Sequence, residues 1–259
     1  MPKRKNNVER NIKLVIQYDG TRYNGWQRKP GDDKTIQYKL ENVISRMLGE
    51  EVLVIGSGRT DKGVHALMQV ANFHSSKKAT FFTCDEMLDY INSHLPQDIA
   101  VISLTEADSD FHARFNCKSK TYLYRIDNRP VQDVFQNKFR THIRPDLDIR
   151  EMKKAIKYFV GKNDFTAFTS NKIKNKNNVR EIFSVEIITH TGNNGFIDIE
   201  YIGNGFLYNM ARIMTGTLLE IGLHKRKTSD IPAIFEGGER AMAGYTAPPE
   251  GLVLTNIEY

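Results

Sequence analysis

The chain has 259 residues, of which 40% are hydrophobic and 18 are glycine, which is typical of a globular protein with a packed core and excludes general disorder. At about 150 residues per domain, this length predicts one or two domains. The longest apolar stretch, residues 206–222, contains Asn209, Arg212 and Glu220, so we expect no transmembrane helix and no membrane partner. The basic N-terminus is followed by no hydrophobic segment, so we do not interpret it as a signal peptide.

The cysteine count and the net charge narrow the class further. Only Cys84 and Cys117 are present, which excludes a disulfide framework and a Cys-rich zinc site and favours two thiols in a reducing cytoplasm. Lys and Arg total 37 against 31 Asp and Glu, a net charge of +6 with a pI near 9.1. This modest excess permits a nucleic-acid partner without establishing one.

Basic residues gather in three segments. They are Arg114, Lys118, Lys120 and Arg125 in the first, Lys172, Lys174, Lys176 and Arg180 in the second, and residues 224–227 in the third. Any one of them is equally consistent with a solvated loop. Together they favour a polyanion, because each neutralised phosphate releases counterions.

In the first part of the chain, residues 12–18 are expected to form a strand. A helix should begin after Thr35, with apolar residues on one face, and end at Gly49. Shorter patterns follow up to the polar stretch 106–110: strands at 52–55 and 69–74, a helix at 85–93 and a strand at 99–105. We place a domain boundary at that stretch, between an N-terminal half, 1–108, and a C-terminal half, 109–259.

The second half opens with an expected strand at 121–127. Asp148 and Glu151 form a capping-box pattern that predicts a helix through residue 160, stopped by Gly161. The remaining patterns are strands at 181–191 and 196–202 flanking Gly-Asn-Asn-Gly, a helix at 206–221 and a strand at 252–258. Because several neighbouring strands look antiparallel, we expect an α+β fold rather than a doubly wound α/β fold.

The loop 56–66 reads Gly-Ser-Gly-Arg-Thr-Asp-Lys-Gly-Val-His-Ala, which is neither a P-loop nor a dinucleotide fingerprint. Arg59 and Asp61 are two residues apart and would point to one side of an extended backbone. An arginine there would hold the carboxylate ionised, and such a carboxylate can act as a nucleophile or a base. On composition alone, a structural Arg–Asp pair is the commoner arrangement.

Two further groups carry possible chemistry. Arg212 lies in a mostly apolar helix pattern, where it either faces an anion in a cleft or reaches water at the helix edge. Tyr122 and Tyr124 share one face of a basic strand; they can stack on unpaired bases, although core packing is the better interpretation for at least one. Trp26 packs or stacks, and its position after a turn fits both. His65 and His74 are too isolated to indicate a metal site.

With these residues in view, nearly the whole chain closely resembles the tRNA pseudouridine synthase A (TruA) family. The motifs that carry the resemblance are Tyr18-Asp-Gly with Tyr23-Asn-Gly-Trp-Gln, Gly58-Arg-Thr-Asp-Lys-Gly-Val-His-Ala, Phe111-His-Ala-Arg-Phe with Lys120-Thr-Tyr-Leu-Tyr, Asn163-Asp-Phe-Thr-Ala-Phe, Gly205-Phe-Leu-Tyr-Asn-Met-Ala-Arg and Ala243-Gly-Tyr-Thr-Ala-Pro-Pro-Glu-Gly-Leu. One departure is Ala211, where the family usually has valine. Several independent motifs in the same order make a chance likeness improbable.

The resemblance implies a pseudouridine synthase fold of two α/β halves with a central, positively charged active-site cleft. It implies isomerisation of uridine to pseudouridine at positions 38, 39 and 40 of the tRNA anticodon stem-loop by a homodimer that uses no cofactor and no metal. By the same resemblance, Asp61 is catalytic, Tyr122 stacks on the target base, Arg212 pairs with the aspartate and Arg59 assists nucleotide flipping. Leu252 falls near the pocket wall.

Two other classes of function stay open at this point. A catalytically idle tRNA-binding or RNA-chaperone protein would need only the basic clusters, although it would not need Asp61. A metal-dependent nuclease or phosphotransferase would need clustered acids, which the sequence does not show. Within the first hypothesis, the carboxylate can attack C1′ of the ribose or remove a proton from C2′, and the sequence does not choose. The basic segment 171–180 is a candidate for a mobile RNA-binding loop.

Overall fold

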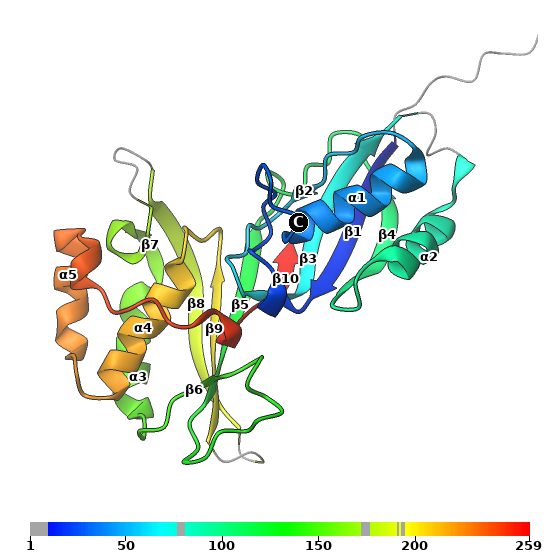
Figure 1. Cartoon of the computed structure of the whole chain (residues 1–259). Coiled ribbons are helices and arrows are strands. Elements are labelled where there is room, and N and C mark those ends of the chain that lie inside the picture. The colour runs from blue at the N-terminus through cyan, green and yellow to red at the C-terminus, as the bar shows by residue number, and fades with distance from the viewer. Residues whose placement is uncertain (1–9, 77–80, 172–176, 191, 193–194) are drawn as a thin grey trace, which may run out of the picture. The chain divides into compact units, whose positions relative to one another are not determined.

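The computed structural model describes residues 10–76, 81–171, 177–190, 192 and 195–259. The chain forms two compact units (Figure 1). The first unit comprises residues up to 117 together with Tyr259, and the second comprises residues 118–258. Each unit contains strands and helices, and all named strand pairs within the units are antiparallel except β5 with β6, which confirms the α+β class.

The first unit is a small antiparallel sheet with two helices. Its elements are β1 (Arg10–Tyr18), α1 (Ile36–Leu48), β2 (Ile55–Gly56), β3 (His65–Ser75), α2 (Cys84–His94) and β4 (Ile99–Ala107). β1 lies between β3 and β4, and β2 pairs with β3. In Figure 1 both helices lie on the same side of this sheet. The predicted helices of this half and three of its four predicted strands are therefore present, with β3 beginning four residues earlier than expected.

Helix α1 forms where the sequence predicts it because both of its ends are capped locally. The Thr35 side chain accepts from the backbone N–H of Tyr38, and Gly49 ends the helix with a left-handed backbone, φ 65°. The apolar side chains of one face are buried, including Leu40 and Ile44, which are fully inaccessible. Helix α2 is likewise capped by a Thr83–Glu86 box.

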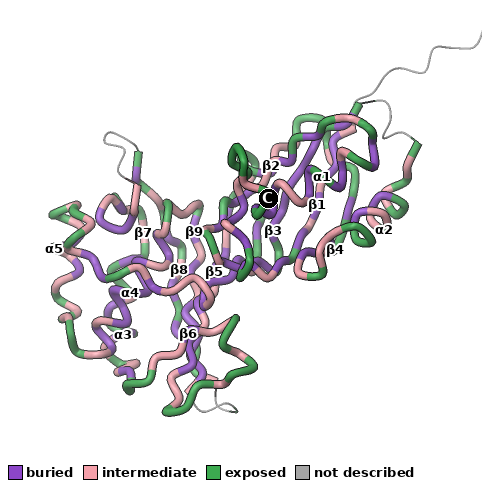
Figure 2. The backbone as a smooth tube through the Cα atoms, viewed as in Figure 1, coloured by how far each residue is buried: buried purple, intermediate pink, exposed green. Residues whose placement is uncertain are grey.

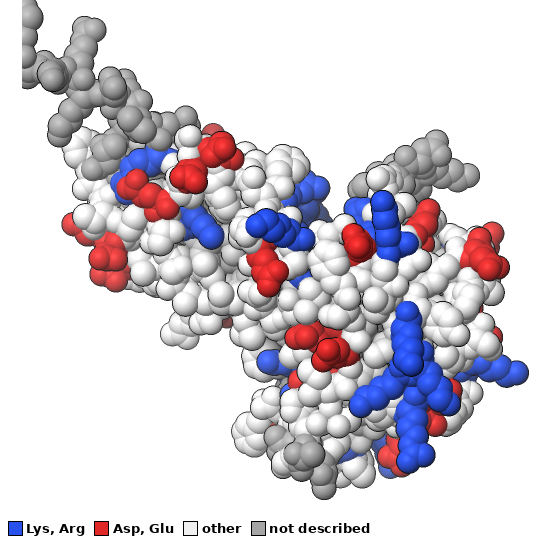
Figure 3. Space-filling view, turned by 180° about the vertical axis from the view of Figure 1, so that it is seen from behind, with Lys and Arg blue, Asp and Glu red and all other residues white. Residues whose placement is uncertain are grey.

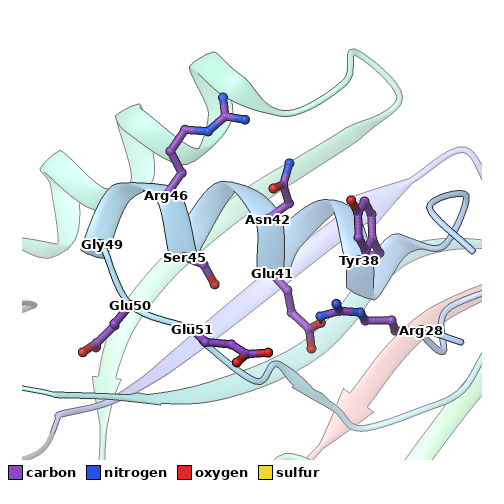
Figure 4. A pocket seen from close by; sticks show the side chains of 9 residues that line it. All are labelled: Arg28, Tyr38, Glu41, Asn42, Ser45, Arg46, Gly49, Glu50 and Glu51. Carbon is purple, nitrogen blue, oxygen red and sulfur yellow. The ribbon is translucent and has the colours of Figure 1, made fainter. Parts of the chain in front are cut away.

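The strand predicted at 52–55 is wrong for its first three residues. The N–H of Val52 bonds to the Ser45 hydroxyl at 2.9 Å, and the N–H of Val54 bonds to the Glu41 carboxylate at 3.1 Å. Side chains of α1 thus take the backbone partners that a neighbouring strand would have supplied. Glu41 is almost completely buried and also accepts from Arg28 at 2.8 Å. Both side chains line an open hollow beside α1 (Figure 4).

Residues 109–117 pack with the first unit. The buried Asn72 side chain accepts from the N–H of Ala113 at 2.9 Å, and Tyr259 donates to the Ala113 carbonyl at 2.7 Å. These bonds tie the segment to β3 and to the end of the chain. The division into domains at residues 108/109 stays a prediction about domain organisation.

The second unit is a longer antiparallel sheet with three helices. Its elements are β5 (Ser119–Asp127), β6 (Thr141–His142), α3 (Ile149–Ala155), β7 (Gly161–Asp164), β8 (Val179–Thr189), β9 (Phe196–Gly203), α4 (Met210–Gly222), α5 (Ile231–Gly237) and β10 (Leu252–Glu258). The strands follow the order β10-β5-β9-β8-β7, with β6 parallel to β5. β8 and β9 pair as the predicted hairpin, whose turn falls mostly outside the described residues.

Two helix predictions in this unit need correction. The helix expected at 206–221 begins only at Met210, because Asn209 adopts a left-handed backbone with φ 61°. The helix expected to run to residue 160 ends at Ala155 and continues as a 3-10 turn, Ile156–Phe159. Asp148 caps its start as predicted, but Glu151 bonds to Lys154 and Thr228 instead of completing the box.

Each unit has its own buried core (Figure 2). In the first unit the core-facing side chains of β1 are inaccessible, including Ile12, Leu14 and Ile16. In the second unit α4 is buried over most of its length. Four phenylalanine rings pack against one another with centroids 5.0–6.0 Å apart, edge to face in all pairs but the tilted Phe168–Phe235 pair; they are Phe159, Phe165, Phe168 and Phe235. No helix in the described part of the chain is long and apolar enough to cross a membrane.

Candidate active site

The glycine-rich loop that carries Asp61 connects β2 to β3 in the first unit. Along it Arg59 is exposed, Thr60 is buried and Asp61 is partly exposed. This alternation is that of an extended backbone, so the two charged residues project away from the core while Thr60 points into it. Within the described ranges Arg59 forms no ion pair, which removes the interpretation of a structural Arg59–Asp61 pair.

Thr60 anchors this loop through a buried hydrogen-bond network. Its hydroxyl lies 2.8 Å from the Tyr18 hydroxyl at the end of β1, and Gln69 of β3 donates to Tyr18 at 3.4 Å. The same Gln69 side chain clamps Gly58, accepting from its N–H at 3.2 Å and donating to its carbonyl at 2.8 Å. Burial raises the pKa of Tyr18, so its phenol stays protonated. The chain directly before Asp61 is thereby held by side chains of the sheet.

The segment before α1 supports the loop from its other side. The N–H of Trp26 donates to the Thr60 carbonyl at 3.0 Å, and the N–H of Gly63 donates to the Tyr23 carbonyl at 3.2 Å. Gly25, with φ 94°, approaches so closely that a Cβ would lie 2.6 Å from the Thr60 carbonyl oxygen. Trp26 is only 1% exposed and fills the space beside Gly56, so it packs and does not stack on a ligand.

Sequence reasoning missed these supporting residues. Tyr18, Gly25 and Trp26 fall in an opening motif that the resemblance included but to which it assigned no role. The available signal was a glycine directly before the only tryptophan, which indicates a close backbone approach. Gln69 carried no signal at all, since a glutamine in a strand is equally common on a solvated face.

Tyr122 lies on β5 in the second unit and is 7% exposed. Its ring meets Phe206 edge-on, with centroids 5.0 Å apart at 75°, and it pairs across the sheet with Tyr201 and Leu254. Tyr124 is fully buried, and its hydroxyl lies 2.7 Å from Thr141. The prediction that at least one of the two tyrosines belongs to the core is therefore confirmed: Tyr124 is inaccessible, and Tyr122 keeps only a small exposed fraction.

Arg212 lies in the first turn of α4 and is partly exposed. Its Nε donates to the Ala247 carbonyl at 2.7 Å and its Nη1 to the Asn209 side chain at 2.9 Å. The N–H of Ala247 in turn donates to the Arg212 carbonyl at 3.1 Å. These neutral acceptors fix the direction of the guanidinium. The left-handed Asn209, which shortens α4, thus also helps to orient the arginine.

Leu252 is the first residue of β10 and is 4% exposed. It pairs with Tyr124, so it belongs to the buried face of this sheet. Arg59 and Asp61 lie in the first unit, whereas Tyr122, Arg212 and Leu252 lie in the second. Their meeting in one cleft stays a prediction from the resemblance.

The three basic segments differ in how many of their charged side chains are exposed to solvent. Arg114 and Lys118 are exposed, but Arg125 is half-buried, and that burial lowers its pKa. In the third cluster Arg226 pairs with Glu220 at 2.9 Å, while Lys225 and Lys227 are exposed. Lys172, Lys174 and Lys176 lie outside the described residues.

Comparisons with known proteins identify the family of the chain. The sequence profile of the tRNA pseudouridine synthase family matches residues 14–116 and 155–259, more than half of the chain. The chain belongs to this family of isomerases.

Relatives match nearly the whole length of the chain. A tRNA pseudouridine synthase A of Bacillus sp. (strain KSM-64) is 48% identical over 96% of this chain and 99% of its own. A tRNA pseudouridine synthase A 1 of Clostridium tetani is 46% identical over 96% of this chain and all of its own. Among solved structures, a Cbf5-Nop10-Gar1 complex covers 94% of this chain and 48% of the matched chain, at 11% identity and a TM-score of 0.36, too low to bear on function.

Proposed function

We propose that this protein isomerises uridine to pseudouridine in the anticodon stem-loop of tRNA, at positions 38, 39 and 40. The observation that carries the proposal is the loop in which a buried Thr60 holds Asp61 partly exposed beside an exposed Arg59, in a chain of the tRNA pseudouridine synthase family. A carboxylate on an anchored backbone is the pre-positioned group that attack at a ribose needs.

The reaction requires little else from the protein. The N1–C1′ bond breaks, the uracil turns, a C5–C1′ bond forms, the C5 proton leaves to solvent, and the freed N1 takes up a proton from solvent. No atoms are gained and no net oxidation occurs, so we propose that neither a cofactor nor a metal takes part. Asp61 acts either as a nucleophile at C1′ or as a base at C2′; both routes are compatible with its position in the loop.

The other residues are assigned to handling the substrate. The target nucleotide has to leave the base stack, at a cost of a few kcal/mol. Stacking on the Tyr122 ring offsets part of that cost, since a base–aromatic stack contributes about 1–3 kcal/mol. Arg59 assists flipping, Arg212 pairs with Asp61, and Leu252 contributes to the apolar wall. These roles follow from the resemblance, and the exposure of Arg59 and the fixed guanidinium of Arg212 support them.

Substrate binding is proposed to draw on the exposed basic residues. Figure 3 shows a dense group of Lys and Arg side chains on one face of the second unit. Three exposed basic residues of that unit lie on one face of α3 and of the turn that follows it: Arg150, Lys153 and Lys157. We propose that the protein acts as a cytoplasmic homodimer and that a tRNA contacts both subunits.

The proposal is tested by tritium release from tRNA transcribed with [5-³H]uridine. Attachment at C5 expels the C5 hydrogen, so the wild-type protein should release tritium. The Asp61→Asn variant should fold, bind tRNA and release none. Asp89→Asn, which alters an exposed aspartate on α2 in the same unit, is the matched control and should behave like wild type.

Two outcomes would reject this function. Substantial tritium release by Asp61→Asn would remove the catalytic role of Asp61. Binding of tRNA without release by folded wild-type protein would favour the idle RNA-binding protein instead. Dependence of activity on a divalent metal would indicate the third class, although the described His, Cys, Asp and Glu residues form no group of three suited to a metal.

A further inference from the structure

Phe115 is an exposed aromatic residue that the proposed function does not use. It lies in the turn after β4, within the first unit, and is 75% exposed. Single exposed apolar residues are common and carry no meaning by themselves. The surroundings of Phe115 make it unusual.

The turn is closed by its own hydrogen bonds. The N–H groups of Phe115 and Asn116 donate to the His112 carbonyl at 3.1 and 3.0 Å, and the His112 N–H donates to the Asn116 side chain at 2.6 Å. The His112 ring nitrogen Nδ1 accepts from the N–H groups of Arg114 and Phe115 at 3.2 and 3.3 Å. The backbone that presents Phe115 is therefore specified within six residues.

The same turn is also hydrogen-bonded to side chains of the sheet of the first unit. Asn72 and Asn11, both buried on neighbouring strands, donate to the Phe111 carbonyl at 3.3 and 2.8 Å. Ala113 is held between Asn72 and the Tyr259 hydroxyl, as described above. Buried amides with several specific partners are costly to place and stabilise one geometry. The exposure of Phe115 is thus a built feature and not the result of a loose loop.

The ring already lies in a stack. The Phe115 and His112 rings are 4.1 Å apart at 29°, and the Arg114 guanidinium lies 5.9 Å from the Phe115 centroid. An exposed planar ring backed by a second ring, with an arginine beside it, is the arrangement that binds unpaired nucleobases. The other exposed side chains of the turn, Arg114 and Asn116, are polar, so the exposed apolar area is too small for a protein partner.

We infer that the His112–Phe115 pair stacks on an unpaired base of the RNA substrate other than the target uridine, and that Arg114 contacts an adjacent phosphate. This inference rests on the proposed function for the identity of the RNA. It adds a substrate-binding site within the first unit, separate from the residues assigned to the target base. Such a site would help to select a looped region over a regular duplex, because only unpaired bases offer a free face.

Charge and stacking should contribute differently to the affinity for RNA at this site. Asp108 and Asp110 are exposed a few residues before the turn and repel phosphates. Most of the affinity should therefore come from the ring. Replacing Phe115 should lower the affinity for tRNA without changing its salt dependence. Replacing Arg114 should reduce the slope of log affinity against log salt concentration by about one, the contribution of one phosphate contact.

The first test compares leucine and tyrosine at position 115. Phe115→Leu keeps an apolar side chain but removes the ring, and it should weaken tRNA binding about tenfold, within the range of one base stack. Phe115→Tyr keeps the ring and should bind within about twofold of wild type. Phe135→Leu is the matched control, because this phenylalanine of the second unit is 88% exposed and no histidine in the described part of the chain stacks on it. Equal affinity of Phe115→Leu and wild type would overturn the inference.

A second test reads the stack directly. The only tryptophan, Trp26, is 1% exposed, so Phe115→Trp introduces an indole whose fluorescence can be followed against a shielded background. Stacking on a base should quench this fluorescence when tRNA is added, and Phe135→Trp should stay unquenched. Absence of quenching at position 115 at saturating tRNA would overturn the inference.

The tests separate this inference from the proposed function. Tritium release by wild type together with an unquenched Phe115→Trp would mean that the enzyme assignment holds and the stacking site does not exist. Quenching without tritium release would mean that the stacking site exists in a protein that only binds RNA. A change of sedimentation mass in Phe115→Leu would show that a second copy of the chain covers the ring, which also overturns the inference.

Discussion

At the scale of single residues, the contacts of each charged or aromatic side chain indicate what it can do. Thr60 and Tyr124 use their hydroxyls inside the core, whereas Asp61 and Arg59 beside Thr60 reach solvent. Arg212 lies between these cases, since neutral acceptors orient a guanidinium that is still partly exposed. Residues that are oriented but accessible are the ones able to act on a substrate.

Two substitutions of Tyr122 distinguish the contribution of its ring from that of its hydroxyl. Tyr122→Phe keeps the stacking surface and should retain the affinity for tRNA, losing only what the hydroxyl contributes. Tyr122→Leu removes the ring and should lower kcat/KM about tenfold further, the worth of one base stack. Tritium release at several tRNA concentrations measures both variants. Identical kinetics for the two would show that stacking is not the contribution of this tyrosine.

Asp127 supports a prediction about pH and stability. Burial alone would raise the pKa of its carboxyl, but hydrogen bonds from Arg129 and the backbone outweigh it and lower the pKa from 3.8 to about 2. A lowered pKa in the folded state means that the stabilisation is complete above the unfolded pKa and is lost as pH falls through about 2. The shift corresponds to about 2 kcal/mol.

The measurement is urea unfolding of wild type and Asp127→Asn. The free energies of unfolding should differ by about 2 kcal/mol at pH 7, and by roughly half as much at pH 3, where the unfolded carboxyl is already protonated. Asp33→Asn, at an exposed aspartate of the first unit, should give no such difference. A gap for Asp127→Asn that stays constant between the two pH values would contradict the pKa shift as its cause.

At the scale of elements, the structure supports the Asp61 loop by its neighbours and not by its own sequence. β1 contributes Tyr18, β3 contributes Gln69, and the segment before α1 contributes Gly25 and the backbone of Trp26. Three separate parts of the first unit therefore determine where one carboxylate lies. Changes in these parts should alter activity without touching the substrate.

Gly25 tests this support against a matched glycine. In Gly25→Ala, a Cβ placed 2.6 Å from the Thr60 carbonyl must push the Asp61 loop away, so kcat should fall at least tenfold. Gly31→Ala carries a similar strain at φ 74° but has nothing within 4 Å, so it should lose only stability, about 1 kcal/mol. Tritium release and thermal melting measure the two effects. Equal activity of the two variants would show that the loop tolerates displacement.

At the scale of the whole molecule, each unit has a core of its own and carries part of the residues assigned to the reaction. Neither unit alone contains all of Asp61, Tyr122 and Arg212. We therefore expect activity to require the intact chain. The second unit also leaves apolar side chains of β8 exposed, among them Phe183 and Ile188, which is compatible with further association.

The proposed homodimer predicts a specific mass. The chain has a mass of 29.7 kDa, so sedimentation equilibrium should give twice this value, 59.4 kDa, at micromolar concentration. The mass should be unchanged in Asp61→Asn, since that substitution affects the reaction only. A sedimentation mass of 29.7 kDa for active protein would show that the monomer is the functional form.

Local signals predicted much of the fold. Helix α1 begins after Thr35 and ends at Gly49 as expected, because a hydroxyl cap and a left-handed glycine act within a few residues of the helix end. Prediction was wrong where a distant partner intervened. Val52 and Val54 read as a strand, but α1 supplies their hydrogen-bond partners. The apolar pattern from residue 206 reads as helix, but Asn209 turns left-handed and orients Arg212.

The sequence by itself determined the class of fold, the family motifs and which loop carries Asp61. It could do so because periodicity, caps and motifs are properties of neighbouring residues. Only the tertiary structure decided that Trp26 packs, that Tyr124 rather than Tyr122 is fully buried, and that Tyr18 and Gln69 hold the loop. These outcomes depend on contacts between residues far apart in the chain. Such contacts exist only after the strands have paired, so no local pattern records them.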